Sequence, residues 1–176
     1  PMNNLVLRQA IAAVGESVLA GEPTLPAALL RREVPAGLAV AASQRPTEAV
    51  VQIGSDLGEA VLAVQGPPGA GKTFAGSALI RQLLDAGRTV GVTATSHAVI
   101  RNLLHEVGRP ALHKVSGDKA EHEASDGLVE LTTDNAVIVD RLASGAARLV
   151  GGTAWAIRAG RVAGRDFDRL IIDLLL

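Results

Sequence analysis

The sequence contains no cysteine and no tyrosine, and its aromatic residues are two Phe and one Trp among 176 residues. Without cysteine, the chain can form neither a disulfide nor a thiolate metal site. Because aromatic residues make up only 2%, stacking on nucleobases cannot be a main binding mode. The same shortage means that Leu, Val, Ile and Ala must fill the core.

A strong excess of positive charge is also missing, since the formal net charge is −1. This argues against a dedicated nucleic-acid-binding module, which usually carries a basic face. No apolar run reaches the roughly 18 residues of a transmembrane helix, and residues 1–4 lack the layout of a signal peptide. We therefore expect a globular cytoplasmic protein that does not bind a membrane.

The chain divides into two parts by pattern. Apolar residues at helical spacing predict short helices over 4–20 and 24–33, and 43–46 is typical of a linker. We expect residues 1–46 to form a helical lead-in segment with a linker, and residues 47–176 to form the main domain.

In the second part, short apolar runs alternate with helical patterns. The predicted strands are 61–64, 89–93, 111–115, 148–151 and 170–173, and the predicted helices are 47–55, 71–86, 96–107 and 134–147. The polar, acidic stretch 116–130 is expected to be a solvated surface insertion. The alternation predicts an α/β fold, with a parallel sheet and helices on both faces.

One motif in this pattern carries chemistry. It matches G-x-x-x-x-G-K-[ST] between a predicted strand and a predicted helix, and consists of Gly66, Pro67, Pro68, Gly69, Ala70, Gly71, Lys72 and Thr73. The glycines allow the backbone to curl with its N–H groups pointing inward, and the helix that follows adds its positive end. Lys72 would reach the outer phosphates, and Thr73 would offer a hydroxyl to Mg²⁺. The motif predicts that the chain binds a nucleoside triphosphate.

The loop and its preceding residue, Gln65-Gly66-Pro67-Pro68-Gly69-Ala70-Gly71-Lys72-Thr73, closely resemble the first motif of superfamily 1 helicases. Residues 90–104 are similar to helicase motif Ia, and the resemblance implies that Thr95, Ser96 and His97 contact a nucleic-acid backbone. The Ser-His pair is similar to a bacterial group in which a RecB-like nuclease precedes the helicase. Gln52 is a candidate for the family's adenine-reading glutamine, at imperfect spacing.

Two later segments extend the resemblance. Gly152-Thr153-Ala154-Trp155 resembles a G-T-A-W segment, which implies that Thr153 lies near the nucleic-acid path. Residues 167–173 resemble the run into the Walker B strand, which implies that Asp173 is a catalytic Mg²⁺ ligand. Leu174 stands where that family has its catalytic Glu. The resemblance as a whole implies an incomplete RecA-like P-loop ATPase domain, truncated at Walker B.

Three functions remain open. The first is an ATP-binding fragment of a helicase that uses ATP and Mg²⁺, binds single-stranded DNA or RNA in the intact protein, and hydrolyses little by itself. The second is a small-molecule P-loop kinase, with Arg158, Arg161, Arg165 and Arg169 as its lid. The third is a non-catalytic nucleotide-binding remnant. The apolar residues at the end of the chain also predict self-association through exposed apolar surface.

Overall fold

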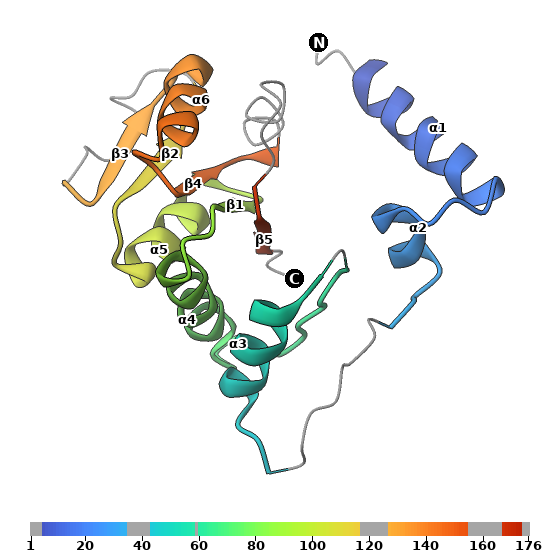
Figure 1. Ribbon diagram of the computed structural model, residues 1–176, viewed down its shortest axis with the longest axis horizontal. Helices are drawn as coiled ribbons and strands as arrows, with labels where there is room; N and C mark the ends of the chain where they lie inside the picture. The colour runs from blue at the N-terminus through green and yellow to red at the C-terminus, as the bar shows by residue number, and fades with distance from the viewer. Residues whose placement is uncertain (1–4, 35–42, 59, 117–126, 155–166, 174–176) are drawn as a thin grey trace.

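The structure is a computed structural model that describes residues 5–34, 43–58, 60–116, 127–154 and 167–173 (Figure 1). Its helices are α1 (Leu5–Leu19), α2 (Leu25–Leu30), α3 (Pro46–Asp56), α4 (Lys72–Asp85), α5 (His97–Val107) and α6 (Asn135–Ser144). Its strands are β1 (Val90–Ala94), β2 (Ala111–Lys114), β3 (Val129–Thr132), β4 (Leu149–Gly152) and β5 (Arg169–Asp173). None of the helices in these ranges has the length and apolar character needed to cross a membrane.

The five strands form one sheet in the order β3-β2-β4-β1-β5, and every neighbouring pair is parallel. Helices α4 and α5 pack against one face, whereas α6 packs against the other (Figure 1). The predicted fold class, an α/β fold with a parallel sheet between helices and with helices at its N-terminus, is therefore confirmed. Most predicted elements lie within two or three residues of the observed ones.

The main core lies between the sheet and the pair α4 and α5. Alternate residues of β1, Val90 and Val92, are fully buried in it, together with Ile80 of α4 and Ile100 and Leu104 of α5. Helix α5 approaches β4 so closely that a Cβ on Gly151 would lie 2.6 Å from Ile100 Cγ2. This close approach is possible because the strand has a glycine there.

The prediction of a buried strand over 61–64 is wrong. This run is extended but joins no strand, and the side chains of Val61 and Val64 are 39% and 46% exposed. The physical reason is that a strand needs a neighbour for its backbone hydrogen bonds, and none of the described strands pairs with this run. An apolar run alone does not supply that neighbour.

The prediction that residues 116–130 form only a surface insertion is wrong at its end. Strand β3 begins at Val129, which is buried, and pairs in register with β2. Glu130 faces α6 instead, where Arg141 donates from Nη1 to Oε2 at 2.7 Å and from Nη2 to Oε1 at 2.9 Å. The acidic composition of this segment predicted a loop. An edge strand can nevertheless carry a charged residue on one face when that charge is paired, as that of Glu130 is by Arg141. Residues 117–126 lie outside the described part.

The N-terminal helices form a small pair of their own. Arg31 Nη2 of the α2 end donates to the carbonyl of Val18 at 2.9 Å, and the hydroxyls of Ser17 and Thr24 lie 3.3 Å apart. Ala27 of α2 is fully buried. Helix α3, by contrast, packs on α4, where Gly54 faces Leu79. The boundary predicted at residues 46 and 47 stays a prediction.

A carboxylate joins the beginnings of β1 and β5. Asp168 Oδ2 accepts from the backbone N–H of Thr89 at 2.7 Å and from its hydroxyl at 2.8 Å, and Arg88 Nη1 lies 3.5 Å from Oδ1. The backbone N–H of Thr89 is the main reason that the pKa of Asp168 lies below its usual value. Burial opposes this shift, while the Thr89 hydroxyl and the Arg88 charge add to it.

We expect Asp168→Asn to lower the free energy of unfolding at neutral pH by about 1 kcal/mol, because a half-exposed carboxylate loses its charged hydrogen bonds. The folded pKa is depressed, so this contribution is complete above the unfolded pKa, near 3.9, and is lost as the pH falls through the folded pKa. Urea unfolding of both proteins between pH 7 and pH 3 measures the difference.

The matched control is Asp85→Asn, whose exposed carboxylate pairs with Arg109 at 2.9 Å. A surface pair of this kind contributes well under about 1 kcal/mol, and its removal should leave the acid limb of the curve unchanged. An Asp168→Asn protein with the wild-type pH dependence would contradict the assignment.

Candidate functional site

The loop before α4 takes a shape that only its glycines allow. Gly69 and Gly71 have φ angles of 78° and 79°, in the left-handed region that other residues adopt at a cost. Gly71 is the N-cap of α4 and places no side chain over the helix end. The first N–H groups of α4, which have no acceptor inside the helix, therefore face the loop without a side-chain cap.

The lysine of the loop arches back across it. Lys72 Nζ donates to the carbonyl of Gly66 at 2.5 Å and to that of Pro67 at 3.1 Å. Its ammonium is thereby held over the loop, beside the amide groups that begin α4. Thr73, in the same first turn, is exposed. A cation, helix-end N–H groups and a hydroxyl thus converge, and this combination fits the phosphates of a nucleotide with its Mg²⁺.

The other predicted site residues lie along one edge of the sheet. Because all strands are parallel, their carboxyl ends meet at the same edge, where β1 ends at Ala94 and β5 at Asp173, its partner in register. Thr95, Ser96 and His97 follow β1, and Thr153 follows β4. The candidate residues from three separate chain segments therefore share the carboxyl edge.

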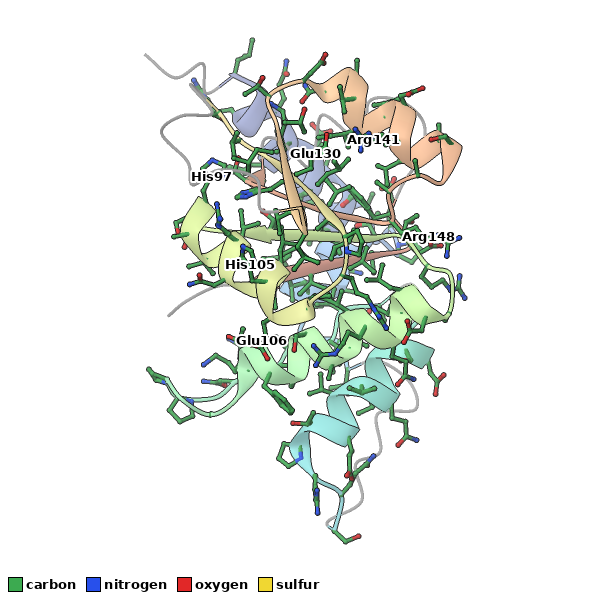
Figure 2. All side chains as sticks on the ribbon, turned by 90° about the vertical axis from the view of Figure 1, so that its left-hand side faces the viewer. His97, His105, Glu106, Glu130, Arg141 and Arg148 are labelled. Carbon is green, nitrogen blue, oxygen red and sulfur yellow. The ribbon has the colours of Figure 1, made fainter. Side chains whose placement is uncertain are left out.

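The loop lies toward this same edge. Four residues connect the end of α4 to β1, so α4 runs back along the sheet and its first turn returns to the carboxyl edge. Figure 2 shows His97 near this edge and Arg148, which precedes β4, at the opposite end, with the start of α4 on the His97 side. Ligands of parallel α/β sheets bind at such a carboxyl edge.

At this edge, two of the residues predicted to contact nucleic acid have hydrogen-bond partners within the protein. The hydroxyl oxygen of Ser96 accepts from the backbone N–H of Val99 at 3.3 Å and so caps α5. His97 Nδ1 lies 3.1 Å from Nε2 of His113, a residue of β2 that is 1% exposed. Thr95 is exposed. No local pattern in the sequence indicates this contact, because His97 and His113 are 16 residues apart and belong to different elements.

Some predicted site residues lie beyond what the structure describes. The backbone of Asp173 ends β5, but its side chain is outside the described part, so its Mg²⁺ role with Thr73 stays a prediction. Trp155 and Leu174 also lie outside it. In the described residues, no group of three or more His, Asp or Glu side chains could hold a metal ion by itself. The loop and a bound nucleotide would have to complete the metal's ligands.

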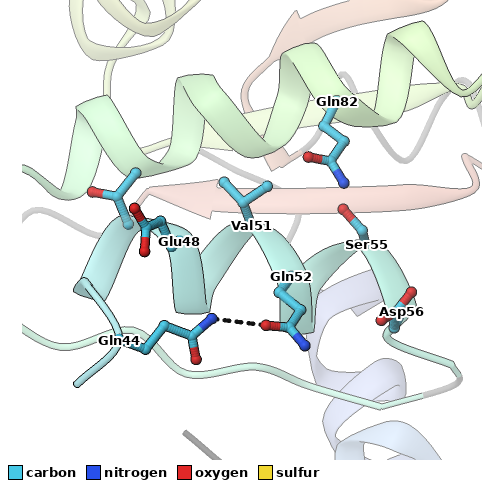
Figure 3. Close-up of a pocket in the computed structure, with 8 residues that line it drawn as sticks. Gln44, Glu48, Val51, Gln52, Ser55, Asp56 and Gln82 are labelled. Atoms are coloured by element: carbon cyan, nitrogen blue, oxygen red, sulfur yellow. Dashed lines mark hydrogen bonds between the residues drawn. The ribbon is translucent and has the colours of Figure 1, made fainter. Parts of the chain in front are cut away.

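A pocket of about 400 Å³ lies away from the loop, between α3 and α4 (Figure 3). The residues that line it are Gln44, Thr47, Glu48, Val51, Gln52, Ser55, Asp56 and Gln82. Gln44 Nε2 donates to Gln52 Oε1 at 2.7 Å, so the amide of Gln52 is engaged within the pocket wall. No loop residue lines this pocket, so the phosphates would bind elsewhere, on the exposed loop itself.

Comparison with known proteins gives one match. A family model described as an AAA domain matches residues 41–152, more than half of the chain. The chain matches none of the curated proteins and none of the solved structures. The matched range includes the phosphate loop, the turn after β1 and all of β4.

We expect Gly71→Ala to weaken nucleotide binding about tenfold, because a Cβ at φ 79° costs roughly 1–2 kcal/mol and alters the loop. The measurement is a titration with a fluorescent nucleotide. Gly76→Ala is the matched control, since Gly76 lies inside α4 with open space around its Cβ position. That variant should bind normally and be more stable, by up to about 1 kcal/mol. Equal affinities for the two variants would contradict the role of the loop.

Proposed function

The chain belongs to the AAA domain family of P-loop NTPases, and on that premise we propose that it is the ATP-binding domain of a superfamily 1 helicase. Such a domain binds ATP at the phosphate loop and nucleic acid at the carboxyl edge of its sheet. The observation that carries the proposal is the loop, with its two left-handed glycines and its arched lysine, at the start of a helix that returns to this edge.

The nucleotide part of the proposal rests on the chemistry of the first turn of α4. The ammonium of Lys72 would exchange the carbonyls of Gly66 and Pro67 for the outer phosphate oxygens, which carry full negative charge. The hydroxyl of Thr73 and the carboxylate of Asp173 would hold Mg²⁺, which neutralises charge on those oxygens when it is bound. Thr73 lies in the first turn of α4 and Asp173 ends β5, and both elements contact β1.

The nucleic-acid part rests on the same edge and on the resemblance to motif Ia. Thr95 and Ser96 are exposed polar residues directly after β1, and Thr153 follows the neighbouring strand β4. Hydroxyl and backbone N–H groups can contact the sugar–phosphate backbone without reading bases. This suits a chain with almost no aromatic residues and little net charge.

Hydrolysis of the bound ATP needs a residue that activates water, and the sequence has no clear candidate for that role. The residue after Asp173 is Leu174, whose side chain can neither orient nor deprotonate a water molecule. We therefore propose that the chain binds ATP but hydrolyses it slowly. The same observation favours a second candidate, a non-catalytic nucleotide-binding domain.

The first test is nucleotide binding by wild type and by Lys72→Ala. Removal of the ammonium should weaken the affinity for Mg-ATP at least about tenfold, since charge-assisted contacts to phosphate contribute roughly 1.5–3 kcal/mol. Arg109→Ala, which removes an exposed cation at the end of α5, should bind as wild type does. If both variants bind equally, the loop is not the nucleotide site.

The second test concerns single-stranded oligonucleotides, followed by fluorescence anisotropy. The double variant Thr95→Ala with Thr153→Ala should weaken binding about three- to tenfold, the effect of one or two lost hydrogen bonds. Ser144→Ala, which removes an exposed hydroxyl at the end of α6, is the control. Binding that is absent in wild type, or is unchanged in the double variant, counts against a helicase and leaves nucleotide binding alone.

A further inference from the structure

His113 is a polar residue at a position that would suit an apolar one. It lies within β2 and is 1% exposed, and its backbone pairs in register with Leu131 of β3 and Gly151 of β4. Its buried neighbours along the chain, Leu112 and Val115, are apolar. Burial of an imidazole is costly unless its nitrogens make hydrogen bonds. The side chain of His113 therefore needs polar contacts, and the fold supplies one.

This contact is with the first residue of α5. His97 Nδ1 lies 3.1 Å from His113 Nε2, with the ring centroids 5.2 Å apart and the ring planes at 47° to each other. Gly151, the register partner of His113, faces α5, since a Cβ there would meet Ile100 and Leu104. Register partners point to the same face of a sheet, so His113 also points toward α5. The contact thus joins the interior of the sheet to the turn after β1, where Figure 2 shows His97.

A hydrogen bond between two imidazoles fixes which nitrogens carry hydrogen, because one of the facing nitrogens must have a hydrogen and the other must not. Two features favour neutral rings. His97 begins α5, where a positive charge would face the positive end of the helix dipole, and His113 is buried. If His113 donates, a neutral His97 carries its hydrogen on Nε2. That nitrogen is then a donor, as contact with a phosphate oxygen requires.

We propose that His113 is a positioning residue for the nucleic-acid site, which donates from Nε2 to Nδ1 of His97 and so presents His97 as a hydrogen-bond donor to a backbone phosphate. The phosphate contact rests on the proposed function, whereas the direction of the hydrogen bond is a property of the protein alone. Because His113 is buried, it acts only through His97. The alternative is a core histidine whose hydrogen bond stabilises the fold and does nothing else.

The direction of the hydrogen bond is tested by NMR of the ring nitrogens, at about pH 8, where an ordinary imidazole is neutral. The chain has four histidines, so each ring can be assigned by single substitutions. Both His97 and His113 should carry hydrogen on Nε2, and a scalar coupling should link His113 Nε2 to His97 Nδ1. A hydrogen on Nδ1 of His97, or the absence of this coupling, overturns the proposal. This result is independent of the proposed function because no nucleic acid is present.

The positioning role is tested by the affinity for single-stranded oligonucleotides. His97→Ala removes the donor and should weaken binding about three- to tenfold. His113→Leu should weaken binding to a similar extent, although the residue is buried. His113→Gln keeps an amide donor near the place of Nε2 and should restore most of the affinity. Leu112→Ala, which alters the core on the other face of β2, is the control for lost stability and should bind as wild type does. Circular dichroism shows whether each variant is folded.

A double-mutant cycle separates positioning from general stabilisation. If His113 acts through His97, His113→Leu should have no further effect on the affinity once His97→Ala is present. Equal affinities of wild type and His113→Leu, or additive effects in the double variant, overturn this proposal and leave the proposed function standing. A wild type that does not bind single strands overturns the proposed function, and this proposal with it.

Discussion

The place of β1 inside the parallel sheet, with β4 on one side and β5 on the other, is the constraint on which the rest of the molecule depends. Residues 90–93 of β1 are buried, Val90 and Val92 pack under α4 and α5, and both edges of the strand are paired. Because its neighbours run parallel to it, each must be reached by a crossover, and all carboxyl ends meet at one edge. The turn after β1, the end of β5 and the residue after β4 are brought together by this arrangement, although they are far apart in sequence.

The phosphate loop obeys a different and more local constraint. Its shape needs two residues in the left-handed region and a lysine within reach of the loop's own carbonyls. These conditions are met although the run before the loop pairs with no strand among the described residues. The loop is anchored from the other side, through α4, whose Leu79, Ile80 and Leu83 belong to the main core. A binding loop of this kind can therefore be formed when only the helix that follows it is packed.

At the carboxyl edge, residues that are proposed to bind nucleic acid also stabilise the fold. Ser96 caps α5, and the ring of His97 contacts the buried His113. Both contacts hold the turn after β1 in one conformation, and a preorganised turn is what a backbone-binding site requires.

The sequence by itself determined the phosphate loop, the fold class and the approximate bounds of nearly all helices. These features depend on local conditions: glycines where φ must be positive, capping residues such as Ser96 and Asp134, and apolar residues at helical spacing. The tertiary structure alone decided which runs become strands and in which order they lie. The run 61–64 is apolar yet unpaired, whereas 129–132 contains a charged residue and is a strand. The pairing of His97 with His113 was decided in the same way. The physical reason is that a strand, or a buried polar contact, exists only when a distant segment supplies the partner, and no local pattern records that partner.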